Sequence, residues 1–208
     1  MARLGRPRSF DREAALYTAM LLFWERGYET ASTSELSAAM GINPPSLYAA
    51  FTNKEQLFRE AIGLYERTEA QSARNAMEAA PTAREAVAAL LHRSVDQFTA
   101  EGKPRGCMIV QAATHCTDDH ESVRDFALRC RARTKSVLKE RLDAAVAAGE
   151  LPSGADTDRT AAFYTTFLNG VSVQARDGAE GAQLHVLVDM AMATWDFVPA
   201  PAGATAGR

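Results

Sequence analysis

The sequence predicts an all-α fold of about nine helices, and three observations carry this prediction. Apolar residues recur at helical spacing in successive segments along the 208-residue chain. Most of these segments begin at a capping residue or end at a glycine. No segment shows the alternation of apolar and polar residues that is typical of a half-buried strand. With 47% hydrophobic and 24% charged residues, the chain has a globular composition and is long enough to bury a core.

The first predicted helix runs from Asp11 to Arg26. Asp11 is a good N-cap residue, and Gly27 ends the helical pattern. Four apolar residues share one face of this helix, which predicts that this face packs against the helices that follow: Leu16, Ala19, Met20 and Phe23.

The segment from Ser32 to Lys54 predicts two short helices joined by a tight turn. Ser32 followed by Glu35 has the spacing of a capping box, and Gly41 ends the first of these helices. Asn43 is the N-cap of the second helix. Two short helices joined by a turn that contains glycine are typical of a helix-turn-helix, although an ordinary helical hairpin fits the same pattern.

The second helix of this pair is too short to be stable without tertiary packing. Pro44 and Pro45 occupy its first positions, where the missing N–H groups cost little. Leu47 and Phe51 are four residues apart and are available to anchor it. The remaining residues are expected to face outward, namely Pro44, Pro45, Ser46, Tyr48 and Ala49.

The flanks of this segment favour the helix-turn-helix interpretation. Leu22-Phe23 and Gly27-Tyr28 precede it, Gly41-Ile-Asn43 forms its turn, and Ser46-Leu-Tyr48 is followed by Asn53-Lys-Glu-Gln-Leu-Phe58. This order and spacing, from about residue 10 to residue 58, resembles the TetR family of transcriptional regulators. The resemblance implies a homodimeric, ligand-responsive repressor that binds a palindromic double-stranded DNA operator.

The resemblance also assigns the DNA contacts. Tyr48 and Lys54 match positions that meet phosphates, Thr33 faces the DNA backbone, and Pro44, Pro45 and Ser46 match base-facing positions. The helix from Asn43 to Phe51 has no charged residue, which departs from the many members that carry Lys or Arg there. Guanine readout is therefore not expected from this helix. The full set of expected contacts in this motif is Ser32, Thr33, Asn43, Pro44, Pro45, Ser46, Tyr48 and Lys54.

The first nine residues predict a flexible basic arm. Arg3, Arg6 and Arg8 lie there among glycine and proline, in a chain whose net charge is −3. Such an arm can reach a minor groove or touch phosphates, whereas the alternative is a solubilising tail. A uniformly basic nucleic-acid binder is excluded by the net charge, so DNA binding depends on local positive charge of this kind.

The remainder of the chain predicts longer helices. One runs from a cap at Asn53 to near residue 79, and further helices are expected over about 82–100, 107–114, 120–148, 157–176 and 181–197. The domain organisation expected from this pattern and the resemblance is a flexible basic arm over residues 1–9, a DNA-binding domain over 10–52, a ligand-binding and dimerisation domain over 53–198, and a disordered tail over 199–208. The resemblance implies that the last two helices form the dimer interface.

The inducer is expected to be a small molecule that is apolar or electrophilic. The expected lining of its site is Met108, Gln111, Phe126, Tyr164 and Phe167. Gly106-Cys107 looks like the Gly-Cys pair of some family members that respond to electrophiles or oxidants. Helix dipole and two nearby cations, Lys103 and Arg105, favour a reactive Cys107 thiolate, whereas the alternative is that Cys107 merely packs.

Other classes of function have less support. The three scattered cysteines favour a reducing compartment, and no signal or membrane-spanning segment is evident, so a cytoplasmic protein is expected. The spacing within His115–His120 matches no zinc pattern, so no metal or other cofactor is expected. An all-α enzyme or an interaction module that does not bind DNA remains the alternative class, although no enzyme motif is present.

Overall fold

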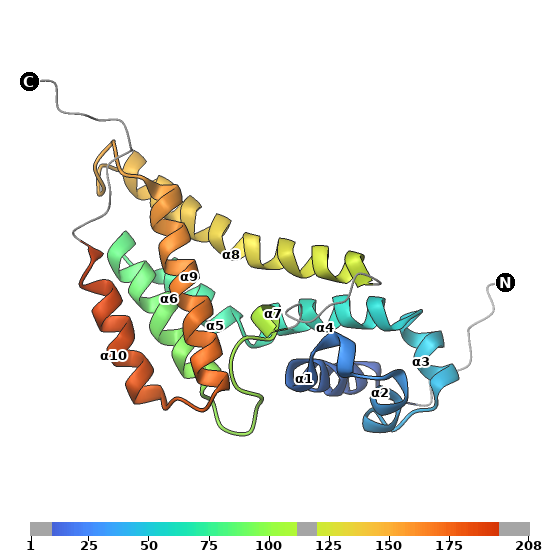
Figure 1. Cartoon of the computed structure of the whole chain (residues 1–208). Coiled ribbons are helices and arrows are strands. Elements are labelled where there is room, and N and C mark those ends of the chain that lie inside the picture. Colours follow the sequence, from blue (N-terminus) through green and yellow to red (C-terminus); the bar gives the residue numbers. More distant parts are fainter. Residues whose placement is uncertain (1–9, 112–119, 196–208) are drawn as a thin grey trace, which may run out of the picture.

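The structure is a computed structural model that describes residues 10–111 and 120–195, and it is entirely helical in these ranges (Figure 1). The all-α prediction is confirmed. The helices are α1 Arg12–Thr30, α2 Thr33–Ala39, α3 Pro44–Phe51, α4 Lys54–Thr68, α5 Gln71–Ala79, α6 Ala83–Phe98, α7 Met108–Gln111, α8 Glu121–Ala147, α9 Thr157–Arg176 and α10 Gly181–Met192. The expected basic arm and the expected disordered tail lie outside the described residues.

The predicted helix starts are confirmed by the caps. Asp11 caps α1, Ser32 and Glu35 form a capping box at α2, and Asn53 accepts a hydrogen bond from the Gln56 N–H at 2.7 Å. Gly27 interrupts α1 because its φ of 78° lies outside the helical region. These features are local in sequence, which is why the pattern of residues alone could predict them.

One predicted helix is wrong. The expected continuous helix from Asn53 to near residue 79 is broken at Glu69 and Ala70 into α4 and α5. The two helices bury their apolar faces against different partners, since α4 packs on α1 whereas α5 packs on α6. A straight helix could not serve both partners, so the chain turns between them.

Two buried clusters organise the molecule. The smaller one holds α1 to α4 together and also includes residues of α7 and of the first part of α8. The larger one joins α5, α6, α9 and α10 to the second part of α8. In Figure 1, α7 lies between these two groups of helices. Cys107, which immediately precedes α7, packs against both clusters.

Among the described residues, no helix combines the length and the apolar character that a membrane-spanning segment needs.

Candidate functional site

Helix α3 is held by its ends and by two apolar anchors. Asn43 accepts a hydrogen bond from the Ser46 N–H at 2.9 Å, and Pro44 and Pro45 occupy the first two helical positions. Leu47 and Phe51 are almost completely buried in the smaller cluster. The expectation that packing holds this short helix is confirmed.

The outer face of α3 is free to meet another surface. Asn43, Pro44 and Pro45 are exposed, Ser46 is half-buried, and 47% of Tyr48 is exposed. This face carries no charge, so hydrogen bonds from Tyr48 and Ser46 and apolar contacts from the two prolines are what it can offer to DNA. The structure thus brings five of the predicted contact residues together.

Helix α2 packs beneath α3 and presents its N-terminus. Ser32 is exposed and Thr33 is half-buried. Hydrogen bonds from the Ser32 backbone and side chain lower the pKa of the Glu35 carboxyl, with a smaller contribution from Arg26. The ionised Glu35 therefore fixes both this helix start and the Arg26 side chain of α1.

The side chain of Lys54 already makes contacts within the protein, which the resemblance did not imply. Its Nζ lies 4.3 Å from the centre of the Tyr28 ring and 3.4 Å from the Glu29 carbonyl oxygen. Both contacts join α4 to the end of α1, so Lys54 has a structural role beside the predicted phosphate contact. Arg3, Arg6 and Arg8 lie outside the described residues.

A tight turn sets the angle between α3 and α4. Thr52 has φ 66° and ψ −56°, and the Asn53 N–H donates to the Phe51 carbonyl oxygen at 2.7 Å. This is a γ-turn, which is strained for a β-branched residue. Thr52 is the one positive-φ residue other than glycine in the part of the chain that the structure describes.

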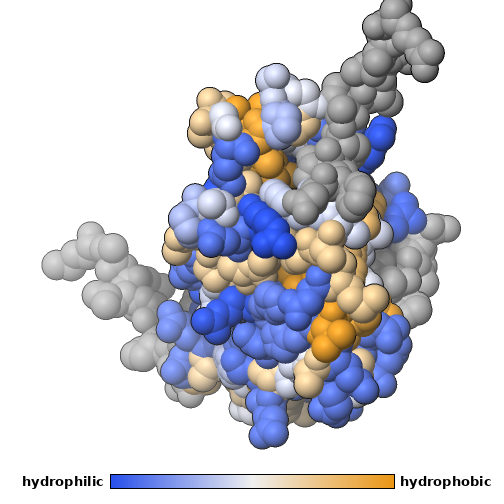
Figure 2. Space-filling model, turned by 90° about the vertical axis from the view of Figure 1, so that its left-hand side faces the viewer, coloured by the Kyte–Doolittle hydropathy of each residue, from blue (hydrophilic) through white to orange (hydrophobic). Residues whose placement is uncertain are grey.

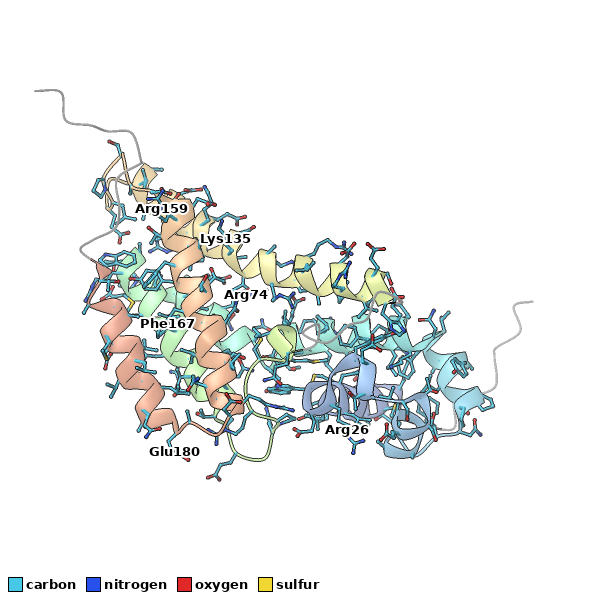
Figure 3. All side chains as sticks on the ribbon, in the orientation of Figure 1. Arg26, Arg74, Lys135, Arg159, Phe167 and Glu180 are labelled. Atoms are coloured by element: carbon cyan, nitrogen blue, oxygen red, sulfur yellow. The ribbon has the colours of Figure 1, made fainter. Side chains whose placement is uncertain are left out.

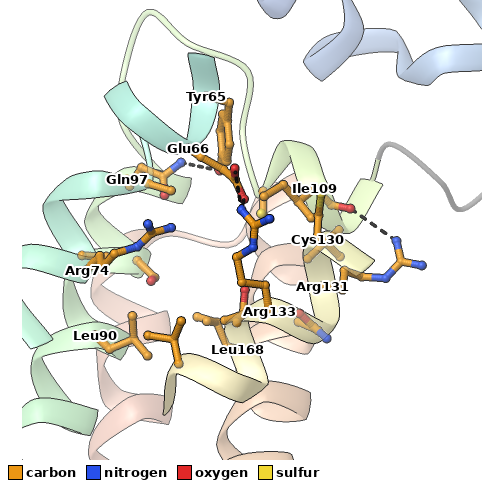
Figure 4. A pocket seen from close by; sticks show the side chains of 18 of the residues that line it. Tyr65, Glu66, Arg74, Leu90, Gln97, Ile109, Cys130, Arg131, Arg133 and Leu168 are labelled. Atoms are coloured by element: carbon orange, nitrogen blue, oxygen red, sulfur yellow. Dashed lines mark hydrogen bonds and ion pairs between the residues drawn. The ribbon is translucent and has the colours of Figure 1, made fainter. Parts of the chain in front are cut away.

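A pocket with a volume of about 100 Å³ lies where α4, α5, α6, α8 and α9 meet α7 (Figure 4). Its wall is partly apolar, with Met77, Leu90, Phe98 and Leu168, and partly polar. On the polar side, the Gln97 amide donates to the Tyr65 hydroxyl at 2.7 Å. Because Tyr65 belongs to α4, a bound molecule would touch the helix that carries the DNA-binding unit.

Of the six predicted ligand residues, Cys107 lines this pocket and the other five do not. Met108 is fully buried in the smaller cluster, and Phe126 packs against the same cluster. Tyr164 and Phe167 belong to the larger cluster, and Figure 3 shows Phe167 on α9, in the half of the molecule away from α3. Gln111 instead donates to the Arg105 carbonyl oxygen at 3.2 Å. Ligand contact by these five residues stays a prediction.

The predicted activation of Cys107 is wrong. Burial raises the pKa of the Cys107 thiol, although hydrogen bonds from Tyr65 and from the Val110 and Ile109 backbone act in the opposite direction. The two expected cations are occupied elsewhere. Lys103 pairs with Glu69 at 2.6 Å, and Arg105 donates to the carbonyl oxygens of Ala175 and Ala179. The thiol is therefore neutral at neutral pH, and the part of its surface that is not buried borders the pocket.

Sequence reasoning missed the polar residues of the pocket. Tyr65, Glu66 and Arg74 fall within a predicted helix, where charged residues normally read as a solvated face. The hydroxyl of Tyr65 at a core position was the one available signal. The turn between α4 and α5 brings Arg74 round to face the same pocket as Tyr65, and that turn was not predicted.

Comparison with known proteins identifies relatives along almost the whole chain. The family model described as "Bacterial regulatory proteins, tetR family" matches residues 15–61, and "Tetracyclin repressor-like, C-terminal domain" matches residues 82–188. The HTH-type transcriptional repressor ComR of Escherichia coli (strain K12) is 33% identical over 92% of this chain and 91% of its own length. BdcR, an HTH-type transcriptional repressor of the same organism, is 31% identical over 90% of each chain.

Solved structures agree with this result. A cysteine mutant of the TetR family transcriptional regulator CifR, complexed with 26bp double-strand operator DNA, is 45% identical with a TM-score of 0.88, and the match covers 91% of this chain and 100% of that chain. AibR, solved with isovaleryl coenzyme A and operator DNA, has the same fold at 20% identity and a TM-score of 0.67, over 86% of this chain and 96% of AibR. Since these relatives are transcriptional regulators, the alternative of an enzyme or of a module that does not bind DNA is set aside.

Proposed function

The chain belongs to the TetR family of transcriptional regulators, and on that premise we propose that two copies bind a pseudo-palindromic operator through α3 and leave it when a small molecule enters the pocket beside α7. The observation that carries the proposal is the outer face of α3. Its apolar anchors point inward while Pro44, Pro45 and Tyr48 point outward, as a helix placed in a major groove requires.

An apolar surface on the last two helices supports a dimer. Phe163 and Val173 of α9 and Val186, Leu187 and Met190 of α10 are large apolar side chains that remain exposed. Figure 2 looks onto the end of the molecule that carries α10 and shows apolar side chains among hydrophilic ones. Exposed apolar residues gathered on adjacent helices are typical of an interface, and a two-fold dimer would match an operator of two half-sites.

Other apolar residues of the last two helices do not belong to this surface. Val171, Leu184, Val188, Ala191 and Trp195 close the larger cluster of the single chain. A charge at Ala191 would therefore disrupt folding rather than the dimer alone. Met190→Glu is the better test, with Leu128→Glu on α8 as the control, since Leu128 is also exposed but lies outside α9 and α10. Sedimentation should show monomers for the first variant and dimers for the second.

Release is proposed to act through α4. Tyr65 of α4 borders the pocket, and its ring packs edge-on against Trp24 of α1 at 4.9 Å between centroids. A ligand that displaces Tyr65 would therefore move α1 and α4 together, and the two α3 helices of a dimer would lose the spacing of successive major grooves.

The test is fluorescence anisotropy with duplexes from the DNA upstream of the coding region. Tyr48→Phe combined with Lys54→Ala should abolish binding of the duplex that the wild-type protein binds. Lys135→Ala is the matched control, because Lys135 lies on α8, far from α3, and pairs with Asp158 (Figure 3). Circular dichroism checks folding, since Lys54 also joins α4 to α1. Equal binding by the folded double variant would contradict the proposed interface.

A further inference from the structure

The charges that line the pocket are unbalanced. Three arginines and one glutamate are present, namely Arg74, Arg131, Arg133 and Glu66. Glu66 is already satisfied, because Arg133 Nη1 lies 3.4 Å and 3.3 Å from its two carboxylate oxygens. Arg131 donates to the Ile109 carbonyl oxygen at 3.3 Å. The excess of charge at the pocket is therefore positive.

Arg74 is the cation that faces the space itself. Figure 4 shows its guanidinium directed from α5 toward the middle of the pocket, between the Gln97 side and the Glu66–Arg133 pair. Within residues 10–111 and 120–195, no carboxylate or carbonyl oxygen pairs with this group. A guanidinium presents its donors as a planar fork that fits a carboxylate with two parallel hydrogen bonds.

No other group in the pocket supplies a compensating negative charge. The Cys107 thiol is neutral, because burial raises its pKa. The Tyr65 hydroxyl is neutral as well, since burial raises the pKa of Tyr65 well above its usual value, although the hydrogen bond from Gln97 acts in the opposite direction. With a partly apolar wall around it, the field of Arg74 is screened less than at an open surface.

The apolar part of the pocket wall fits a hydrocarbon body. It consists of Ala73, Met77, Leu90, Phe98, Val137 and Leu168. The volume of about 100 Å³ is smaller than the ~150 Å³ of an apolar cavity that binds benzene, so the pocket suits a ligand of roughly four to six non-hydrogen atoms. A coenzyme A thioester is several times larger than this space.

We propose that the inducer is a small monocarboxylate with an apolar body, whose carboxylate is bound by Arg74 and whose body lies against the α5, α6 and α9 wall. This inference rests on the proposed function, because it names the ligand class of the same pocket. Arg74 selects the charge, and the wall selects the size and the apolar character.

The ligand would add contacts between helices that line the pocket. Its carboxylate would fix α5, and its body would press on α6 and α9, beside Tyr65 of α4. Occupancy would thus act on the turn between α4 and α5, which is where the α4 helix of the DNA-binding unit ends.

The experiment is isothermal titration calorimetry of the 208-residue protein with three probes of similar length: butanoate, its neutral analogue butanamide, and the cation butylamine. A second carboxylate, 2-methylpropanoate, tests a branched body. The variant is Arg74→Gln. Arg67→Gln is its control, because Arg67 is an exposed arginine of α4 that does not line the pocket.

We expect at least one carboxylate to bind the wild-type protein and the Arg67→Gln variant, and to bind Arg74→Gln about tenfold or more weakly, as loss of a charge-assisted hydrogen-bond pair implies. The affinity for butanamide should differ little between the three proteins. Equal carboxylate affinity for Arg74→Gln and wild type, tighter binding of butylamine than of butanoate, or no binding of either carboxylate would each overturn the proposal.

Operator binding separates this inference from the proposed function. Ligand-free wild-type protein and the Arg74→Gln variant should bind the same operator equally, because Arg74 lies far from α3. Failure of the wild-type protein to bind any upstream duplex would refute the repressor proposal. Intact operator binding combined with any of the overturning titration results would refute the carboxylate inference alone.

Discussion

Gly106 provides the sharpest quantitative test of the structure, because two separate costs of adding a methyl group can be measured there. Its φ is +78°, a conformation that side chains with a Cβ rarely adopt. A Cβ built at this position would also lie 2.7 Å from the Ser172 carbonyl oxygen, a backbone atom of α9 that cannot easily move. It would also contact the Gln111 amide, which is the flexible end of a side chain and can shift.

Gly149 is the matched control. Its φ is +76°, nearly the same as that of Gly106, and no heavy atom lies within 4 Å of the Cβ position. Gly149→Ala should therefore destabilise the protein by roughly 1–2 kcal/mol, because alanine is placed in the left-handed conformation, and it introduces no steric clash. In both variants, alanine also stabilises the folded protein by about 0.4–1 kcal/mol, because it reduces the conformational entropy of the unfolded chain.

The difference between the two variants isolates the contact with Ser172. Overpacking of this kind costs about 1–3 kcal/mol, so Gly106→Ala should reduce the free energy of unfolding by that much more than Gly149→Ala does. Urea denaturation with an unchanged m value gives both numbers. The proteins are compared at one concentration, because dimer stability depends on it. Equal destabilisation by the two variants would refute the close approach of Gly106 to α9.

Three further predictions follow from the turn, the thiol and the arm. Thr52→Gly should raise the free energy of unfolding by about 0.5–2 kcal/mol, since the relief of backbone strain exceeds the cost of the added entropy of the unfolded chain. A lower free energy of unfolding, measured by urea denaturation, would contradict this. Cys107 should be alkylated more slowly than a free thiol at pH 7 and faster as pH rises, because its pKa is raised and the thiolate reacts; pH-independent labelling contradicts this. Deleting residues 1–8 should flatten the salt dependence of operator binding by roughly 0.9 in log–log slope per lost phosphate contact, and an unchanged slope would make the arm only a tail.

The features predicted correctly from sequence depend on neighbours along the chain. Asn43, Pro44 and Pro45 define the start of α3 whatever surrounds it, and Leu47 and Phe51 mark its buried side by their spacing. Family resemblance added what spacing could not, namely the expectation that this helix contacts DNA, which stays a prediction. The start and the buried side of α3 could be predicted because the helix-turn-helix spans few residues.

The pocket depends on packing between distant segments, and for this reason most of its lining was not predicted. Arg74 reaches it because α5 turns away from α4 to pack on α6, and no residue near Glu69 signals that turn. The chemistry of Cys107 was misjudged for the same reason. Spacing placed two cations nearby, whereas their actual partners, Glu69 and the end of α9, come from elsewhere in the chain.

The junction at Gly106 and Cys107 connects the helices around the pocket to α1. The Gly106 carbonyl oxygen accepts a hydrogen bond from Trp24 Nε1 at 3.1 Å, and the Gly106 N–H donates to the Phe98 carbonyl oxygen at 2.9 Å. The Cys107 N–H donates to Ser172 Oγ at 2.8 Å. Two adjacent residues thus join α1 to α6 and α9, the helices on either side of the boundary between the two clusters. A shift of this junction by a ligand cannot satisfy all three bonds unless α1 moves with it, and α1 is packed directly on α4.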